Sequence, residues 1–229
     1  MRSLRPQLPL ALLAILAAFA LGLAACGDDE EPSETTAASE PGCAEVDAPA
    51  PKDDSFKRPE RVLEPGQPAT ATVETSCGSF TIALDTKRSP NTANSFAFLA
   101  EQGFYDDTVF HRIAPGFVIQ GGDPKGSDPQ LAGSGGPGYS ITEAPPQSTT
   151  YRRGLVAMAK TEVEPPGTSG SQFFVVTAPA DAGLPPDYAV LGKVSEGMDV
   201  VAAIGELGDP ATEQPTQAVT IDQVTVDDA

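Results

Sequence analysis

The sequence predicts a mainly β domain in residues 69–229, arranged as a closed antiparallel barrel with two helices. Three observations support this fold class. Short runs rich in β-branched and aromatic residues recur along this part of the chain, loops rich in Gly and Pro separate them, and only two segments have helical spacing. Because strands and helices do not alternate, repeated βαβ units are not expected.

The domain is predicted to begin with a hairpin and a helix. Two β-rich runs, 70–75 and 79–85, flank a short turn that contains Gly78. Ser89 suits the cap and Pro90 the first position of a helix of about 13 residues that stops at Gly103. The apolar positions Phe96, Leu99 and Ala100 recur at helical spacing, which predicts an amphipathic helix.

The rest of the domain is predicted to hold mostly short strands. They are expected at 108–113, 116–120, 154–159, 172–177 and 189–194, with a second short helix at 198–204. The last strand spans 218–226, where Val219 and Ile221 fall out of step with Val224 and Val226. This change of phase predicts a β-bulge.

Residues 1–25 have the pattern of an export signal. Two Arg residues precede a long apolar run, and small residues lead to Cys26. The segment Leu23-Ala24-Ala25-Cys26 resembles the lipobox of bacterial lipoproteins, which implies cleavage before Cys26 and a lipid anchor on its thiol. An ordinary secretory signal that contains a Cys is the alternative. We expect an extracytoplasmic protein anchored to the outer face of the bacterial cytoplasmic membrane.

Residues 26–68 are predicted to form a disordered tether behind the lipid anchor. Residues 27–68 hold 12 acidic and four basic side chains together with seven prolines, without strand or helix periodicity. Like charge and low hydrophobicity favour a solvated, extended chain. The same charge would repel anionic lipid head groups, so attachment would rest on the acyl chains.

Two cysteines remain once Cys26 is assigned to lipid. In an oxidising compartment Cys43 and Cys77 can form one disulfide, which would join the end of the tether to the first hairpin. Closing this loop would stabilise the fold by roughly 3–4 kcal/mol. Two unpaired thiols are the alternative.

The charge and the histidine content exclude several functions. A formal charge of -18 leaves no basic surface for general nucleic-acid binding, which depends on clustered Lys and Arg. The single histidine, His111, excludes chemistry that needs several imidazoles, and no metal site is expected. His111 is expected to be structural, and Asp123, which follows two glycines, to serve a turn.

Four segments carry the functional signal. They read FHRIAPGFVIQGGD at 110–123, GSGGPGY at 133–139, GLVAMA and GSQFFVVT within 154–177, and VLGKV at 190–194. In this order they resemble the signature blocks of the cyclophilins, which are peptidyl-prolyl cis-trans isomerases. The resemblance implies an eight-stranded closed barrel capped by two helices, with a shallow proline-binding groove outside it. It also implies no cofactor, a monomer, and proline-containing peptides or folding proteins as partners.

The resemblance assigns roles by position. Arg112 corresponds to the catalytic arginine. The substrate-binding residues are expected to be Phe117, Val118, Gln120, Met158, Ala159, Lys160, Gln172, Phe174, Leu184 and Tyr188. Of these, Phe117, Met158, Phe174 and Leu184 would line the apolar proline pocket, while Gln120 and Gln172 would hold the peptide backbone. Gly133 is expected at the edge of the groove.

Some positions depart from the family pattern. The chain has no Trp, whereas many members carry one beside the pocket, near the position of Gly183. Tyr188 stands where many have a histidine, and Lys160 replaces a common asparagine. The segment 161–166 is longer than usual. These changes bear on peptide preference and on sensitivity to cyclosporin.

A guanidinium suits isomerisation because no bond is broken. The twisting amide nitrogen loses conjugation and becomes a better hydrogen-bond acceptor, which a permanently protonated Arg112 can meet. A catalytically weak module that binds proline segments as a chaperone or scaffold is the alternative. A solute-binding lipoprotein would need two large lobes, for which residues 69–229 are too few.

Overall fold

The computed structural model describes residues 42–228. The predicted signal at 1–25 and the lipidation site Cys26 lie outside the described residues. Within residues 42–228, none of the helices has the length and apolar character that crossing a membrane requires.

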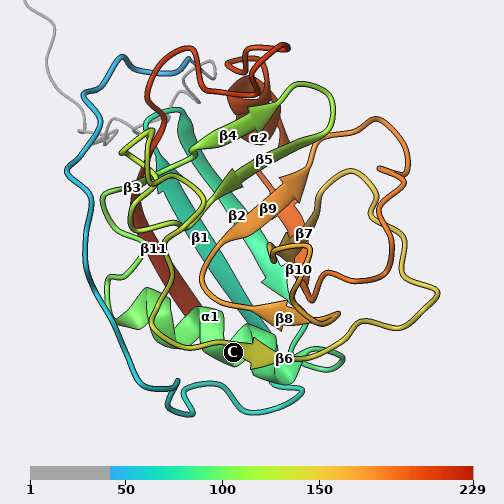
Figure 1. Cartoon of the computed structure of the whole chain (residues 1–229). Coiled ribbons are helices and arrows are strands. Elements are labelled where there is room, and N and C mark those ends of the chain that lie inside the picture. Colours follow the sequence, from blue (N-terminus) through green and yellow to red (C-terminus); the bar gives the residue numbers. More distant parts are fainter. Residues whose placement is uncertain (1–41, 229) are drawn as a thin grey trace, which may run out of the picture. The chain divides into compact units, whose positions relative to one another are not determined.

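The domain is built on one curled antiparallel sheet (Figure 1). Its nine strands follow the order β3 (Thr108–Val109), β11 (Thr220–Asp228), β1 (Ala69–Thr75), β2 (Gly78–Leu84), β10 (Val190–Glu196), β7 (Leu155–Met158), β9 (Phe173–Val176), β5 (Val118–Gly121) and β4 (Arg112–Ala114). Two short strands that were not predicted, β6 (Ile141–Thr142) and β8 (Thr168–Ser169), pair separately. The predicted mainly β class with two helices is confirmed.

The sheet differs from an eight-stranded closed barrel at its edges. The predicted strand 108–113 is interrupted after Val109, so that its first part, β3, pairs with β11 and its second part, β4, pairs with β5. The two edge strands are therefore consecutive in the chain. A single bridge joins Val109 of β3 to Asp123, which follows β5, and the curled sheet stops short of a β3–β4 ladder in the described residues.

The predicted bulge in the last strand is confirmed. Glu74 of β1 lies opposite Gln223, but the next residue, Thr75, lies opposite Ile221, which leaves Asp222 without a partner residue. The extra residue shifts the phase of β11. Ile221 and Val224 can therefore both face the core although they are three positions apart.

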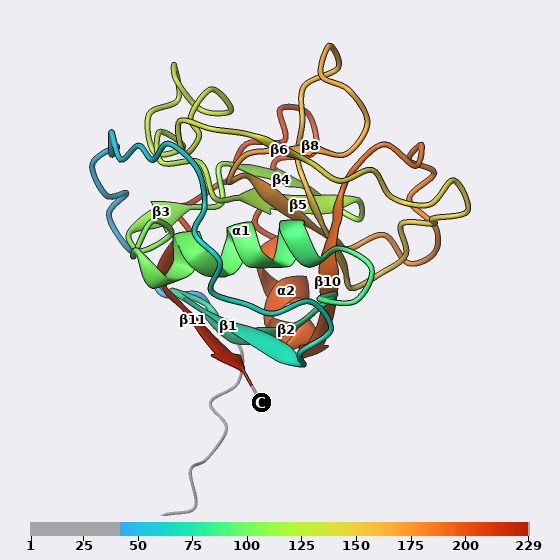
Figure 2. The same ribbon diagram turned by 90° about the horizontal axis from the view of Figure 1, so that it is seen from below.

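Two helices lie at opposite ends of the sheet (Figures 1 and 2), α1 (Pro90–Glu101) and α2 (Met198–Gly205). The helix positions agree with the predictions, and Gly103 ends the first helix with a φ of 64°. The amphipathic character predicted for α1 is wrong, because residues 92–100 are all buried. Its N-terminus is also not capped by the Ser89 side chain. Glu143 instead accepts the backbone N–H of Thr92 at 2.8 Å.

Residues 42–68, which were predicted to be a solvated tether, run along the outer side of α1 and cover it (Figure 2). That prediction is wrong for this segment. Leu63 is only 4% exposed, the Phe56 ring meets Phe98 edge-on, and Asn94 accepts the backbone N–H of Leu63 at 3.0 Å. Lys52 donates to the Asp106 carbonyl at 2.7 Å. These contacts are widely spaced along an irregular segment. The sequence therefore shows no strand or helix periodicity that would predict its packing against α1.

A disulfide joins the start of this segment to the first hairpin. Cys43 and Cys77 are bonded, and the N–H of Ala44 donates to the Ser76 carbonyl at 2.8 Å. Cys77 lies in the main core. The segment is thus fixed to the domain near Cys43 and again at α1.

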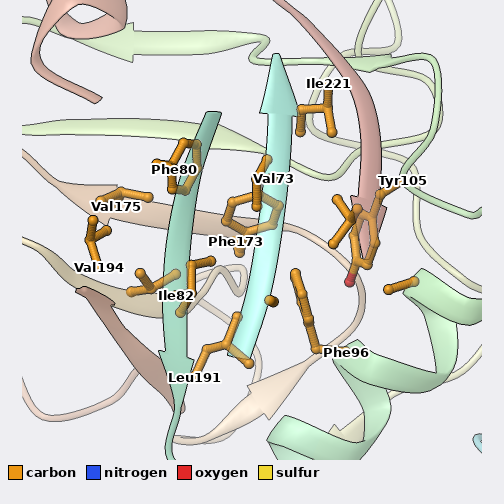
Figure 3. Packing of buried hydrophobic residues seen from close by; sticks show 14 of the residues in the cluster. Val73, Phe80, Ile82, Phe96, Tyr105, Phe173, Val175, Leu191, Val194 and Ile221 are labelled. Atoms are coloured by element: carbon orange, nitrogen blue, oxygen red, sulfur yellow. The ribbon is translucent and has the colours of Figure 1, made fainter. Parts of the chain in front are cut away.

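The hydrophobic core has two parts that lie on opposite faces of β9. The main cluster fills the inside of the curled sheet, where Figure 3 shows Phe173 among residues of β1, β2 and β10. A smaller cluster outside the sheet contains Phe174, Tyr151 and Val176. Because neighbouring strand residues point to opposite faces, adjacent phenylalanines serve different clusters. The outer cluster is the floor of the site described next.

Candidate functional site

Three antiparallel strands bring the predicted site residues into one row. Arg112 of β4 lies opposite Gln120 of β5, and Gln120 lies opposite Phe174 of β9. Side chains at such opposed positions share a face of the sheet. The row therefore joins a cation, an amide and an aromatic ring that are up to 62 positions apart in the sequence.

A hollow of about 200 Å³ opens beside this row. It is lined by Arg112, Phe117, Val118, Gln120, Ala159, Lys160, Phe174, Leu184 and Tyr188. Sites for drug-sized ligands usually measure about 300–1,000 Å³, so this hollow, the ring pocket, suits a single side chain. All nine residues were predicted from the sequence.

Aromatic rings form one wall of the ring pocket. The Phe174 and Tyr188 rings meet edge-on with centroids 5.4 Å apart, and Tyr151 lies behind both. The Tyr151 hydroxyl donates to the Tyr188 carbonyl at 2.7 Å and accepts its N–H at 3.0 Å. Burial raises the pKa of Tyr151 to about 12, so this hydroxyl stays protonated. Sequence reasoning missed Tyr151, although it stands just before the motif at 154–159.

A chain of polar side-chain contacts lies beside the ring pocket, on the side of Arg112 and Gln120. Arg112 Nη1 donates to Gln120 Oε1 at 3.4 Å, and Gln120 Nε2 donates to Gln172 Oε1 at 3.1 Å. Gln172 Nε2 in turn donates to the carbonyls of Gly133 and Gly135 at 3.1 and 2.9 Å. The predicted pair Gln120 and Gln172 therefore lies together, oriented by the loop that contains Gly133.

A wider hollow of about 680 Å³ continues from the ring pocket. Its walls are mainly residues 133–140 and 170–172, and it shares Gln120, Ala159 and Lys160 with the ring pocket. Lys160 Nζ donates to the carbonyls of Thr161 and Glu164 and lies 5.6 Å from the Tyr188 ring centroid. The two hollows form one groove in which an extended peptide has room on one side of the ring pocket.

Met158 does not line the ring pocket, which corrects the prediction. It is 1% exposed and belongs to the main core inside the sheet. Its neighbour Ala157, opposite Phe174, is the residue that faces the outer cluster. The alternation of side chains along β7 therefore turns Met158 away from the groove.

Asp123 has the structural role in a turn that was expected, and His111 lies near it. His111 Nδ1 is buried without a hydrogen-bond partner among the described residues. Burial lowers the pKa of His111, while the nearby Asp123 acts to raise it and Arg112 to lower it. Asp123 accepts the N–H groups of Lys125 and Gly133 at 2.7 and 2.6 Å. Asp123 thus shapes the loop that orients Gln172.

One charged contact of Arg112 was not foreseen. Arg112 Nε donates to Glu213 Oε2 at 2.7 Å, although the two residues are 101 positions apart. Glu213 lies in the loop after α2, outside every sequence motif. Only the tertiary fold reveals this pair.

The arrangement suits binding and orientation. An apolar ring can enter the ring pocket while the guanidinium and the two amides contact a peptide backbone beside it. Within residues 42–228, no group of three or more His, Cys, Asp and Glu side chains is placed to hold a metal ion.

Comparisons with known proteins agree with this geometry. Residues 70–226 match the family model described as cyclophilin type peptidyl-prolyl cis-trans isomerase/CLD. A peptidyl-prolyl cis-trans isomerase of Arabidopsis thaliana is 34% identical over 160 residues, which cover 68% of this chain and 92% of the plant protein. Peptidyl-prolyl cis-trans isomerase A of Mycobacterium tuberculosis is 36% identical over 176 residues, with coverage of 69% and 92%.

Solved structures show the same fold. The crystal structure of a cyclophilin-type peptidyl-prolyl cis-trans isomerase from Cryptosporidium parvum is 28% identical, with a TM-score of 0.62 and coverage of 70% of this chain and 98% of that one. A second crystal structure of that protein, determined in the presence of the dipeptide Ala-Pro, has a TM-score of 0.61 and coverage of 69% and 98%. The chain therefore belongs to the family of cyclophilin-type peptidyl-prolyl cis-trans isomerases.

Proposed function

We propose that this chain accelerates the cis-trans isomerisation of X-Pro bonds, with the proline ring in the ring pocket and Arg112 beside the amide. One observation carries the proposal. The Arg112 guanidinium lines a hollow sized for one side chain, together with the apolar side chains of Phe117 and Leu184, and lies in one row with Gln120 and Phe174. The Cryptosporidium parvum relative crystallised in the presence of Ala-Pro supports a proline ligand.

The chemistry follows from amide resonance. Rotation about the peptide bond has a barrier of about 18–20 kcal/mol, and X-Pro exchange takes tens to hundreds of seconds without a catalyst. At the twisted transition state the proline nitrogen regains a lone pair. A guanidinium N–H of Arg112 that donates to this nitrogen would stabilise the transition state more than the planar ground state.

The ring pocket contributes in a different way. Phe117, Phe174 and Leu184 would fix the pyrrolidine ring and exclude water from the guanidinium contact, which strengthens it. Gln120 would hold the rotating part of the backbone. A millionfold acceleration corresponds to about 8 kcal/mol, more than one hydrogen bond supplies, so binding of the twisted conformer must share the task.

We further propose that the protein acts outside the cytoplasmic membrane, anchored through Cys26. The lipobox-like segment and the Cys43–Cys77 disulfide support this location, because disulfides persist in oxidising compartments. Proteins that fold after export would then be its substrates. Metabolic labelling with a fatty-acid analogue would detect the anchor, and Cys26→Ala should abolish the label.

The isomerase proposal is tested with a proline tetrapeptide and NMR exchange spectroscopy. The protein should raise the exchange rate between the cis and trans forms, and Arg112→Ala should lose most of this effect. Arg88→Ala is the matched control, because Arg88 is an exposed arginine paired with Asp85 before α1. Wild-type protein that binds the peptide without raising the rate would overturn the enzymatic proposal in favour of a proline-binding chaperone or scaffold.

A further inference from the structure

The unforeseen partner of Arg112 comes from the loop after α2. Glu213 Oε2 accepts Arg112 Nε–H at 2.7 Å, while Gln120 Oε1 accepts an Nη1 hydrogen of the same guanidinium at 3.4 Å. We propose that Glu213 is a positioning residue, which holds the Arg112 guanidinium in its working orientation. This inference rests on the proposed function of Arg112.

The backbone of Glu213 is fixed to the strand that carries Arg112. The Glu213 carbonyl accepts the Ile113 N–H at 2.8 Å, and the Glu213 N–H donates to the Asp209 carbonyl at 2.7 Å. Asp209 Oδ1 also accepts the N–H groups of Ala211 and Thr212 at 2.7 and 2.9 Å. The loop is therefore closed by its own hydrogen bonds and attached one residue away from Arg112.

The conformation of Glu213 points to the same conclusion. Its φ is 57°, in the left-handed region that residues other than Gly seldom adopt. Such a conformation persists where the surrounding contacts enforce it, and it is concentrated at functional sites. Here it directs the Glu213 side chain to Arg112 while the backbone stays bonded to Ile113.

The contacts leave part of the guanidinium free. An arginine has five N–H donors in a rigid plane. Nε–H is used by Glu213 and one Nη1 N–H by Gln120, so three Nη donors remain for a peptide. Two hydrogen bonds hold the Arg112 guanidinium plane, so its free Nη donors point in a fixed direction. Donors that are already oriented lose less conformational entropy when the transition state forms.

The pair is too exposed to serve mainly as a structural brace. The side chains of Arg112 and Glu213 are 36% and 44% exposed. Ion pairs with this exposure contribute little to folding stability. Removing the carboxylate should therefore leave the fold intact. The carboxylate also offsets the positive charge of Arg112, so an account based on charge alone predicts a faster enzyme without Glu213, whereas positioning predicts a slower one.

The test compares Glu213→Ala and Glu213→Gln with the control Glu206→Ala in the NMR exchange assay. Glu206 is an exposed acid at the end of α2. Glu213→Ala should lower kcat/KM about tenfold, equal to about 1.4 kcal/mol, with most of the loss in kcat. Glu213→Gln keeps an oxygen that accepts Nε–H and should stay within about threefold of wild type, as should Glu206→Ala.

A second readout follows Arg112 itself. The ¹⁵N order parameter of the Arg112 Nε–H bond should fall in Glu213→Ala and stay near the wild-type value in Glu213→Gln. A Glu213→Ala variant with wild-type or higher kcat/KM would overturn the inference, as would a Gln variant as slow as the Ala variant. An inactive wild-type protein would instead overturn the proposed function, which separates the two failures.

Discussion

The Tyr151 hydroxyl is bonded to both backbone groups of Tyr188, since it donates to the carbonyl at 2.7 Å and accepts the N–H at 3.0 Å. Two hydrogen bonds to one residue fix the edge of the ring pocket, where the Tyr188 ring stands against Phe174. The rigidity of this wall therefore depends on a buried side chain beneath the groove.

Tyr151→Phe tests this dependence. It removes one hydroxyl and leaves the N–H and carbonyl of Tyr188 without that partner, so the free energy of unfolding should fall by about 1–3 kcal/mol. KM for a proline peptide should rise with it. Tyr188→Phe, which leaves the Tyr188 backbone and the Tyr151 hydroxyl in place, is the control in urea unfolding. Equal stability of wild type and Tyr151→Phe would contradict the role given to Tyr151.

The single histidine allows a direct titration. Burial lowers the pKa of His111 from 6.5, so its imidazole resonance should titrate below that value. A depressed pKa means that the stability contribution is present above pH 6.5 and lost as the pH falls through the folded-state pKa. His111→Gln should therefore flatten the decline in stability over this range. If the NMR titration of the His111 imidazole had its midpoint at or above pH 6.5, burial would not lower its pKa as described.

The segment 42–68 should contribute to stability. Leu63 is 4% exposed and packs in the main core, so Leu63→Ala should lower the free energy of unfolding by about 2–5 kcal/mol. Val46→Ala, at an exposed position of the same segment, should change it by less than about 0.5 kcal/mol. If both variants unfold at the wild-type urea concentration, the segment does not pack as described.

The Cys43–Cys77 disulfide should stabilise the fold in addition to the packing of residues 42–68. The two cysteines are 34 positions apart, and replacing both with Ser should lower the free energy of unfolding by roughly 3–4 kcal/mol. Alkylation and mass spectrometry of the oxidised protein should find both thiols protected. Free thiols at both positions would contradict the disulfide.

Local patterns predicted most elements and most of the groove. Short β-rich runs predicted the positions of the strands, and Pro90 and Gly103 predicted the two ends of α1. The change of phase between Ile221 and Val224 predicted the β-bulge. The motifs at 110–123 and 154–177 contain Arg112, Gln120 and Phe174, which strand pairing brings together.

The remaining features depend on contacts that no local pattern records. Glu213 and Tyr151 reach the site through loops, and their partners lie 101 and 37 positions away. Met158 was misplaced because its motif identifies the strand, whereas alternation with Ala157 decides which face it occupies. Residues 42–68 contact the domain through a few separated residues such as Phe56 and Leu63, and these leave no periodic signal in an acidic, Pro-rich chain, so the sequence predicts a tether instead.

The Arg112 guanidinium is proposed to accelerate X-Pro isomerisation after the proline has bound. NMR exchange rates and chemical-shift titrations on one tetrapeptide, with wild type and Arg112→Ala, separate the two steps. We expect that the peptide still shifts the resonances of Phe117 and Phe174 when it binds Arg112→Ala, but that this variant loses about a hundredfold or more of the acceleration, as expected for a lost transition-state donor. An Arg112→Ala variant that accelerates exchange as well as wild type would contradict it.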